Sequence, residues 1–413
     1  MSTLAEVRDK TGIAVARPLT TGARRRWAEL PASGLIREHV WQPLVDTVGE
    51  AYRKQYYPLG YTPALDGLRG LITVGVVVAH VRYPLVPGSL HYMDIFYVMS
   101  GYFITALLLR DLDRHGRIRF LEFYRRRFAR ILPPFLIMVV AYLAFRWLVF
   151  PPFSAALTDA AIGFSYATSW WRAFDLPGIS YMSHTWSLSI EEQFYLLWPI
   201  TLLLLVRAFG VSWRLVIAIG VLALMIWGWR IWLTSTHVPF WRLYNGPDTR
   251  ADALLVGCTL AVMLKMISPG VGPSLDRLLS KLAWPFLIAA PLLLFFYPWQ
   301  YNDLRFYHIG IMCCGALPGA VLVTMLVRCS GTIVHRCLER PEAVFLGKIF
   351  YGMYLWHFPV VMLLKDLAGA PNLVRFLVGF PLTVLLATLS YAYVERHFMR
   401  SRNVTPVPVA AVA

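Results

Sequence analysis

Three ionisable residues near the start of the apolar part of the chain have the types and spacing to carry out chemistry: Arg69, His80 and Asp94. Arg69 and His80 stand eleven positions apart. At about 100° per residue this is three helical turns plus roughly 20°, so one helix face carries both, about 16 Å apart along its axis. Histidine can act as a general base near neutral pH, and a neighbouring carboxylate can orient its ring. We therefore predict that His80 is catalytic and that Asp94 holds it from the next helix. The alternative is a buried polar network that only joins the two helices.

A dense cluster of arginines precedes the third apolar segment, in the sequence RIRFLEFYRRRFARILPP. Arginine pairs well with phosphate groups, because the guanidinium offers parallel N–H donors. We predict that Arg69, Arg125, Arg127 and Arg130 form an anion-binding site at the cytoplasmic boundary of the membrane. The alternative is that these arginines only mark the topology of the chain.

Two adjacent carboxylates occur at the start of the fourth apolar segment, in the sequence SHTWSLSIEEQFYLLWP. Glu191 and Glu192 are costly at a membrane entrance unless they have a role. Tyr195 follows Glu191 at helical spacing, and Trp186 precedes both carboxylates. We predict that these four residues bind an acceptor substrate near the outer membrane surface. Aromatic residues at such a boundary can also serve as interfacial anchors.

Two further segments place polar residues within apolar surroundings. Arg250 lies in DTRADALLVG, where an internal ion pair with Asp248 or Asp252 is the alternative to a binding role. His357 lies in YGMYLWHFPV, among aromatic residues that suit a small-ligand pocket or that simply pack. Arg250 and His357 complete the predicted substrate-binding set.

Membrane-spanning helices must position these residues. Of the 413 residues, 58% are hydrophobic and 15% are charged, whereas soluble domains carry about 25% charged residues. The mean hydropathy is +0.56, and apolar runs of about 20 residues, long enough to cross a bilayer, recur along the chain. We predict an all-α polytopic membrane protein with about ten transmembrane helices, at residues 68–87, 92–110, 130–150, 186–206, 214–233, 249–267, 283–299, 309–328, 345–365 and 374–394.

The distribution of charge orients these helices. A net charge of +16 is typical of basic cytoplasmic loops, and nucleic acid is not expected as a partner. An eleventh span at 155–171 would turn Arg207 and Arg214 outward, so we predict that 151–185 is an outer, partly re-entrant segment. Both termini are then cytoplasmic, and the protein lies in the cell membrane as a multi-pass protein.

Three parts of the chain are expected. Residues 1–60 form a basic cytoplasmic segment without a signal peptide, in which 27–45 could lie on the membrane surface as an amphipathic helix. Residues 61–400 form the membrane domain, and residues 401–413 form a short cytoplasmic tail.

Several other kinds of chemistry find no support in the sequence. The five cysteines have no metal-ligand spacing with histidine, so we expect no bound metal. The chain contains no G-x-S-x-G and no Walker loop, and Ser100 in MSGYF lacks the context of a nucleophilic serine. Internal repeats are not evident, which weakens a transporter hypothesis.

Taken together, these segments resemble the acyltransferase-3 family of bacterial integral membrane O-acyltransferases. The resemblance runs from about Tyr61 to Phe398, and seven parts carry it in order: LDGLRG with the Arg69–His80 spacing, DIFYVMSGYFIT, YRRRFARILPP, HTWSLSIEEQFYLLWP, DTRADALLVG, YGMYLWHFPV and YAYVER. The family often has proline after the final Glu-Arg pair, whereas His397 follows that pair here.

The resemblance implies a ten-helix domain that takes an acyl group, such as acetyl or succinyl, from acyl-CoA on the cytoplasmic side, with no permanently bound cofactor. His80 looks like the catalytic histidine, and Arg69 looks like an arginine on the CoA side. The acceptor would be a hydroxyl group of an envelope carbohydrate or glycolipid. Because the sequence stops at Ala413, we do not expect the extracytoplasmic esterase-like domain that such proteins can carry.

Several alternatives stay open at this point. Direct transfer and an acyl-histidine intermediate are both compatible with the residues. An acyltransferase that tailors antibiotics such as macrolides would use the same module. A transporter of an anionic lipid or metabolite is a third hypothesis, and a non-catalytic receptor is a fourth. The oligomeric state does not follow from the sequence.

Overall fold

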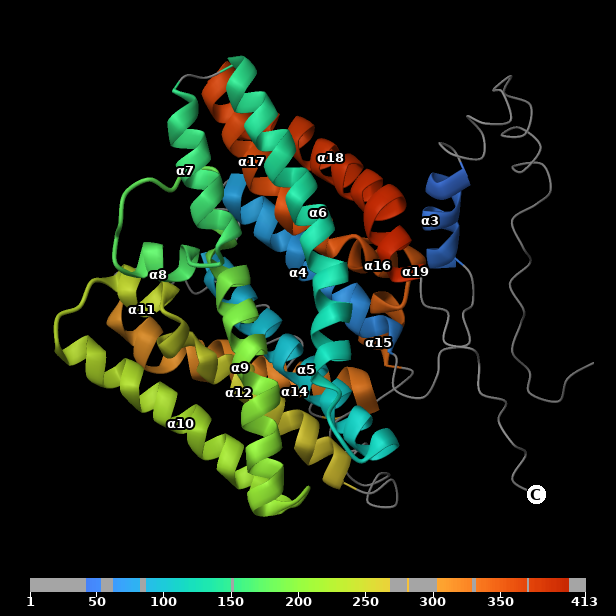
Figure 1. Ribbon diagram of the computed structural model, residues 1–413, viewed down its shortest axis with the longest axis vertical. Coiled ribbons are helices and arrows are strands. Elements are labelled where there is room, and N and C mark those ends of the chain that lie inside the picture. Colours follow the sequence, from blue (N-terminus) through green and yellow to red (C-terminus); the bar gives the residue numbers. More distant parts are fainter. Residues whose placement is uncertain are drawn as a thin grey trace, which may run out of the picture. The chain divides into compact units, whose positions relative to one another are not determined.

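The computed structural model describes residues 42–52, 62–81, 87–149, 152–267, 281, 303–328, 332–369 and 371–400. Every element within these residues is a helix, which confirms the all-α prediction for this part of the chain (Figure 1). The chain divides into two units, Met1–Asp46 and Thr47–Ala413. In the first unit only the start of α3 (Gln42–Tyr52) is described. The predicted amphipathic segment 27–45 therefore lies almost entirely outside the described residues.

The helices of the second unit follow one another in the order α4 (Pro63–Val81), η3 (Pro87–His91), α5 (Tyr92–His115), α6 (Phe120–Val149), α7 (Phe153–Phe164), α8 (Thr168–Ala173), η4 (Ser183–Thr185), α9 (Trp186–Phe209), α10 (Trp213–Ser235), α11 (Phe240–Asn245), α12 (Pro247–Met266), η6 (Phe306–Ala316), α14 (Leu317–Arg328), α15 (Ile333–Leu338), α16 (Pro341–Lys348), α17 (Phe350–Ala368), α18 (Asn372–Ser390), η7 (Tyr391–Glu395) and α19 (Arg396–Arg400).

Among the described residues, seven helices are long and apolar enough to cross a membrane: Pro63–Val81, Ser89–His115, Phe120–Val149, Ser183–Phe209, Trp213–Ser235, Phe306–Arg328 and Asn372–Phe398. A bent pair of helices raises the number to eight if it counts as one span. Each of these overlaps one predicted span. Predicted span 249–267 corresponds to α12, which has 20 residues but is less apolar because charged residues lie near both of its ends. Predicted span 283–299 lies outside the described residues.

The predicted span at 345–365 is broken, which corrects the expectation of one straight helix. Pro341–Lys348 and Phe350–Asp366 meet at an angle of 69°. The reason is that α16 packs against the beginning of α4. A Cβ atom on Gly347 would lie 1.9 Å from the carbonyl oxygen of Asp66, so the two backbones touch there. The chain then turns at Ile349 before α17 begins.

The centre of the fold is the contact between α5 and α12. Small residues allow these helices to approach closely, since a Cβ on Gly101 would lie 1.9 Å from the Leu254 carbonyl oxygen and a Cβ on Gly257 would lie 2.0 Å from that of Val98. Close packing through glycine is a common way for helices to associate in membranes, where lipid is as apolar as the side chains. Within its most apolar window, the α5 span is 67% buried, compared with 22% for α10.

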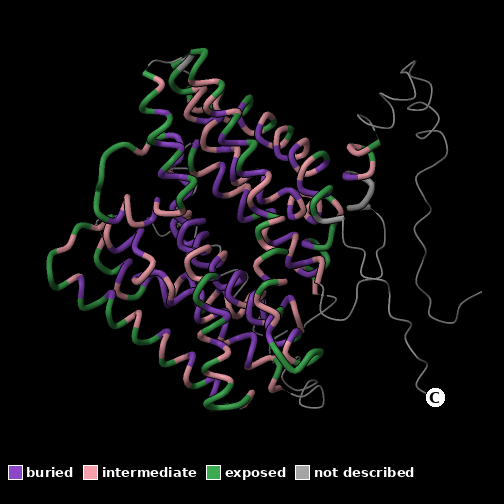
Figure 2. The backbone as a smooth tube through the Cα atoms, viewed as in Figure 1, coloured by how far each residue is buried: buried purple, intermediate pink, exposed green. Residues whose placement is uncertain are grey.

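The outer helices keep apolar side chains on their exposed faces. Figure 2 shows exposed residues along the full length of α10, and the exposed large side chains of this helix include Ile217, Leu224, Met225 and Trp232. Water would penalise such a surface, whereas hydrocarbon accepts it. The pattern therefore supports a chain embedded in a membrane, with α10 at its periphery.

The segment between α6 and α9 contains no helix that could span a bilayer. Helix α7 has 12 residues and α8 has six, both far short of the roughly 20 that a crossing needs. Helix α9 then begins with six consecutive buried residues, Trp186 to Glu191, and its start packs against α8. Helix α9 thus begins inside the fold, and this determines the depth at which its first polar residues lie.

Candidate active site

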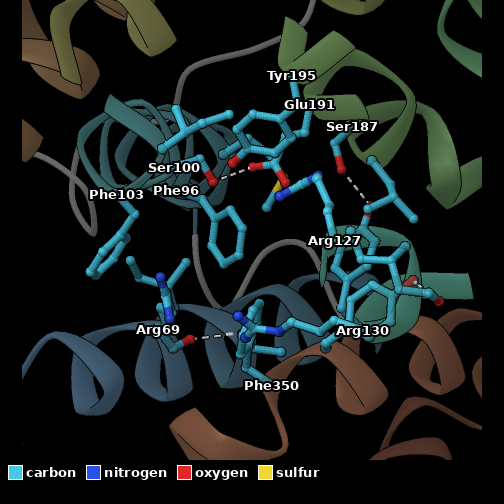
Figure 3. Close-up of a pocket in the computed structure, with 18 of the residues that line it drawn as sticks. Arg69, Phe96, Ser100, Phe103, Arg127, Arg130, Ser187, Glu191, Tyr195 and Phe350 are labelled. Carbon is cyan, nitrogen blue, oxygen red and sulfur yellow. Dashed lines mark hydrogen bonds between the residues drawn. The ribbon is translucent and has the colours of Figure 1, made fainter. Parts of the chain in front are cut away.

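One cavity of about 190 Å³ lies among the described helices, enclosed by α4, α5, α6, α9 and α17 (Figure 3). It receives polar side chains from all five helices, and Ser100 is the polar residue that α5 contributes. The lining includes Arg69, Ser100, Arg127, Arg130, Ser187, Glu191, Tyr195 and Tyr354. The basic residues come from α4 and α6, and the acidic residue comes from α9.

Helix α4 provides one wall of the cavity through residues spaced at three and four positions. Arg69, Ile72, Thr73 and Val76 all line it. His80 lies one turn beyond Val76, and its Nδ1 is 2.8 Å from the Val76 carbonyl oxygen. The helical period that the sequence predicted thus directs Arg69 into the cavity and puts His80 on the same row, at its far end.

Arg69 is held in place by neighbours on both sides of its guanidinium. Its Nη1 lies 3.2 Å from Oδ1 of Asp66. The guanidinium carbon lies 3.9 Å from the ring centroid of Phe103 and 5.3 Å from that of Phe350. Cation–π contacts and one carboxylate orient the side chain while leaving N–H donors for an anionic ligand.

The predicted arginines of α6 differ in their surroundings. Arg127 pairs with Glu192, with Nε donating to Oε2 at 2.9 Å. Arg130 lines the cavity and has no ion-pair partner among the described residues; its nearest aromatic ring is Phe350, at 5.8 Å. Arg125 is exposed and does not line the cavity. Of these three, Arg130 is thus the arginine most available to a phosphate, and the structure does not support a site role for Arg125.

Glu191, Glu192 and Tyr195 lie beside the arginines, whereas the sequence predicted the acidic and basic sets at opposite membrane surfaces. Glu191 accepts a hydrogen bond from Ser100 at 2.6 Å, and the guanidinium of Arg127 lies 3.4 Å from the Tyr195 ring centroid. The reason is the buried start of α9, which brings these residues to the depth of α6. The acidic and basic sets therefore form one polar centre instead of two separate binding sites.

Asp94 does not hold His80, so the predicted pairing of these two residues is wrong. Both residues are described, and no hydrogen bond or ion pair joins them. Asp94 is fully buried and binds Arg250 through Oδ1 at 2.5 Å and His91 Nδ1 through Oδ2 at 3.0 Å. The helices α5 and α12 pack so closely that Asp94 meets Arg250 from α12 before it can reach α4.

Two predicted substrate-binding residues serve packing instead. Arg250 is fully buried in its ion pair with Asp94 and does not line the cavity. Its partner is not Asp248 or Asp252, as the alternative held, because these carboxylates pair with Arg242 and Arg230. Trp186 is buried with its ring centroid 4.9 Å from that of Tyr244. Both side chains stabilise the centre of the fold.

Histidines from three elements gather next to Tyr354, although none of them is among the residues that line the cavity. The ring of His80 lies 5.0 Å from that of His357, and the ring of His184 lies 5.4 Å from that of His357. Tyr354, which lines the cavity, connects the two regions: its hydroxyl lies 2.5 Å from Ser187 Oγ and donates to the His184 carbonyl oxygen. The predicted residue His357 therefore lies beside His80.

Sequence reasoning missed His184. It stands in SHTWSLSIEEQFYLLWP, two positions before Trp186, and the prediction for this segment rested on its two carboxylates. Its burial, with an exposed fraction of 2%, is visible only in the structure, and no pattern in the sequence around it indicates this.

The arrangement supports a ligand with two chemically different ends. Arginines at one end of the cavity favour an anion, such as phosphate. Ile72, Thr73 and Val76 on α4 lead away from them, and His80, whose imidazole can accept a proton, follows one turn beyond Val76, outside the residues that line the cavity. The fold and this site together define a multi-pass membrane protein with an arginine-lined internal cavity.

Comparison with known proteins identifies the family. A family model described as an acyltransferase domain matches residues 62–392. The chain belongs to the acyltransferase-3 family. It is 30% identical over 363 residues to the peptidoglycan O-acetyltransferase OatA of Listeria monocytogenes, covering 83% of this chain and 56% of that protein. It is also 30% identical over 363 residues to the O-acetyltransferase OatA of Staphylococcus aureus, covering 83% and 58% respectively.

A third relative is a putative O-acetyltransferase of Staphylococcus aureus, 29% identical over 365 residues, covering 84% of this chain and 58% of that protein. The chain thus spans somewhat more than half the length of the curated relatives it matches. No solved structure matches it significantly.

Proposed function

We propose that the protein transfers an acyl group from acyl-CoA to a hydroxyl group of a cell-envelope carbohydrate. The observation that carries this proposal is the row on α4, where Arg69, Ile72, Thr73 and Val76 line the cavity and His80 follows one turn beyond Val76. An acyl-CoA molecule has the same polarity, with phosphates at one end and a thioester at the other. The names of the relatives favour acetyl as the acyl group and peptidoglycan as the acceptor.

The donor would bind with its phosphates at the basic end of the cavity. Arg69 and Arg130 provide N–H donors there, and Arg127 contributes positive charge that Glu192 partly neutralises. Coenzyme A is a cytoplasmic metabolite, so the arginine end would face the cytoplasm, in agreement with the positive-inside rule. The pantetheine arm would then follow Ile72, Thr73 and Val76 towards His80.

The chemical step requires one base. The Nδ1 of His80 lies within hydrogen-bond distance of the Val76 carbonyl oxygen. Because that oxygen can only accept, the neutral ring carries its hydrogen on Nδ1 and has a lone pair on Nε2. Nε2 would take the proton from the acceptor hydroxyl while that oxygen attacks the thioester carbonyl. The carbon–sulfur bond breaks, an ester forms, and the departing CoA thiolate takes the proton back from His80. No net proton is consumed.

Reconstituted protein can test this function directly. Purified protein in nanodiscs would receive radiolabelled acetyl-CoA and soluble peptidoglycan glycan chains, with ester formation on the glycan as the readout. We expect transfer by the wild type and at least a hundredfold loss in His80→Ala, which corresponds to losing general-base catalysis. His115→Ala, on the last turn of α5, serves as a matched control with normal activity.

Two results would contradict the proposal. Near-normal transfer by a folded His80→Ala variant would exclude His80 as the base. Passage of intact acyl-CoA into sealed vesicles, without cleavage of the thioester, would identify a transporter instead of a transferase.

A further inference from the structure

Two buried nitrogen atoms on histidine rings near His80 have no hydrogen-bond partner. They are Nε2 of His184 and Nε2 of His357. Both side chains are enclosed, with exposed fractions of 2% and 0%. A buried polar atom without a hydrogen bond costs free energy, and native proteins keep very few of them. Two such atoms on neighbouring rings therefore indicate that a ligand supplies the missing contacts.

The other ring nitrogens determine which kind of contact is missing. The Nδ1 of His184 lies 3.2 Å from the Tyr181 carbonyl oxygen, and the Nδ1 of His357 lies 2.7 Å from that of Tyr354. A carbonyl oxygen only accepts, so each Nδ1 carries the hydrogen. In a neutral imidazole the remaining nitrogen is then an acceptor. Both unpartnered Nε2 atoms therefore seek a hydrogen-bond donor.

The fold fixes these two rings from several directions. His184 follows a loop that Asp159 holds by accepting hydrogen bonds from the backbone nitrogens of Ser180 and Met182, at 2.8 and 3.2 Å. The centroid of the Phe358 ring lies 5.2 Å from that of His184 and 6.3 Å from that of His357. The imidazoles are thus held in fixed positions, which is what a binding site requires.

A metal ion is a poor match for this arrangement, since no group of His, Cys, Asp or Glu residues in the described part of the chain has the geometry to hold one. An anion is also a poor match, because two lone pairs would face its negative charge. The ligand class that fits is a neutral molecule with several hydroxyl groups. A sugar ring offers O–H donors on adjacent carbons.

We propose that His184 and His357 form the acceptor subsite and bind the hydroxyl groups next to the one that His80 deprotonates. This inference rests on the proposed function and adds to it the residues that select a polyhydroxylated acceptor. His184 and His357 act as positioning residues. Phosphate recognition by the arginines that line the cavity is separate from them.

The test pairs protein variants with modified acceptors. His357→Phe and His184→Phe keep a planar ring but remove the accepting nitrogen, and His115→Phe is the control. The acceptors are a chitooligosaccharide and analogues that lack one hydroxyl. We expect each variant to raise KM for the intact acceptor about tenfold, the loss of one hydrogen bond to a hydroxyl. The KM for acetyl-CoA should not change.

The decisive measurement is the interaction between the two changes. In the wild type, the analogue that lacks the recognised hydroxyl should bind about tenfold more weakly. In the variant that lacks the histidine recognising that hydroxyl, removal of the hydroxyl from the acceptor should not weaken binding further. Equal losses in wild type and variant for every analogue would overturn the proposal, since a purely structural role gives that result.

Two further measurements keep the outcomes distinct. If a phenylalanine variant does not fold, His357→Gln and His184→Gln retain an accepting oxygen and should recover part of the acceptor affinity; no recovery in folded protein counts against the subsite. Slow hydrolysis of acetyl-CoA without acceptor should persist in the His184 and His357 variants and disappear in His80→Ala. Loss of hydrolysis in all three would mean that the cluster acts in the chemical step instead.

Discussion

Arg127 on α6 and Glu192 on α9 bind each other at the wall of the cavity, with the Arg127 Nε 2.9 Å from Oε2 of Glu192. A second N–H of Arg127 donates to Oε1, so the pair is bidentate. The Tyr195 ring lies under the guanidinium, 3.4 Å from its carbon. This contact fastens α9 to α6 at the depth where Glu191 and Arg130 enter the cavity. It also means that Arg127 has already satisfied most of its charge before any ligand binds.

The first prediction concerns the stability that this pair contributes. Arg127→Gln and Glu192→Gln should each destabilise the protein by about 1–3 kcal/mol, because each leaves a partly buried charge without its partner. The double variant should lose less than the sum of the two, since it leaves no lone charge. Thermal unfolding in detergent measures the four proteins, and additive losses would show that the pair is not coupled.

The second prediction separates ligand binding from stability on the same helix. Arg130→Ala should raise KM for acyl-CoA by roughly tenfold to a hundredfold, because one charge-assisted hydrogen bond contributes about 1.5–3 kcal/mol. Its melting temperature should stay close to the wild-type value, because Arg130 has no ion-pair partner among the described residues. Arg125→Ala, which removes an exposed arginine outside the cavity, is the control and should change neither quantity. Equal effects of the two substitutions would show that only general charge matters.

The third prediction follows from the buried pair of Asp94 and Arg250. Asp94→Asn leaves Arg250 charged and buried without a counter-ion, which should cost about 3–5 kcal/mol. We expect little folded protein, with near-normal turnover in the fraction that folds, because Asp94 does not contact His80. Size-exclusion profiles and the turnover per folded molecule test both parts. A well-folded variant with low turnover would restore the original expectation of a catalytic aspartate.

The fourth prediction concerns the close contact of α5 and α12. Gly101→Ala places a Cβ where the Leu254 carbonyl oxygen stands, so the helices must separate, at a cost of at least about 1–3 kcal/mol. Gly228→Ala on α10 is the matched control, because nothing lies within 4 Å of a Cβ there. The yield of monodisperse protein should fall for the first variant and stay unchanged for the second. Equal yields would show that the helices can adjust without loss.

Local periodicity accounts for what the sequence could predict. Hydropathy located the described helices that are long and apolar enough to cross a membrane, because a bilayer imposes a minimum apolar length on any spanning segment. The common face of Arg69 and His80 followed from the helical repeat, which depends on no other part of the chain. Arg127 and Arg130 lie three positions apart on α6 and reach the same cavity for the same reason.

Pairings across helices could not be predicted in this way. Asp94 was expected beside His80 and meets Arg250 instead, because two glycines bring α5 and α12 into backbone contact. Glu192 was expected near the outer surface and meets Arg127, because α9 begins inside the fold. The local sequence pattern of a helix does not predict how deep in the fold that helix begins.

The sequence by itself determined a multi-pass helical membrane protein of the acyltransferase-3 family and the helix face that carries Arg69 and His80. These features depend on composition and on contacts within one helix. The tertiary structure alone decided which charges neutralise each other and which histidines gather around His80. His184 and His357 stand far apart in the chain, and only the packing of η4 and α17 brings their rings to 5.4 Å. Such long-range contacts depend on the packing of all the helices together, because in a close-packed interior the position of one helix limits where its neighbours can lie.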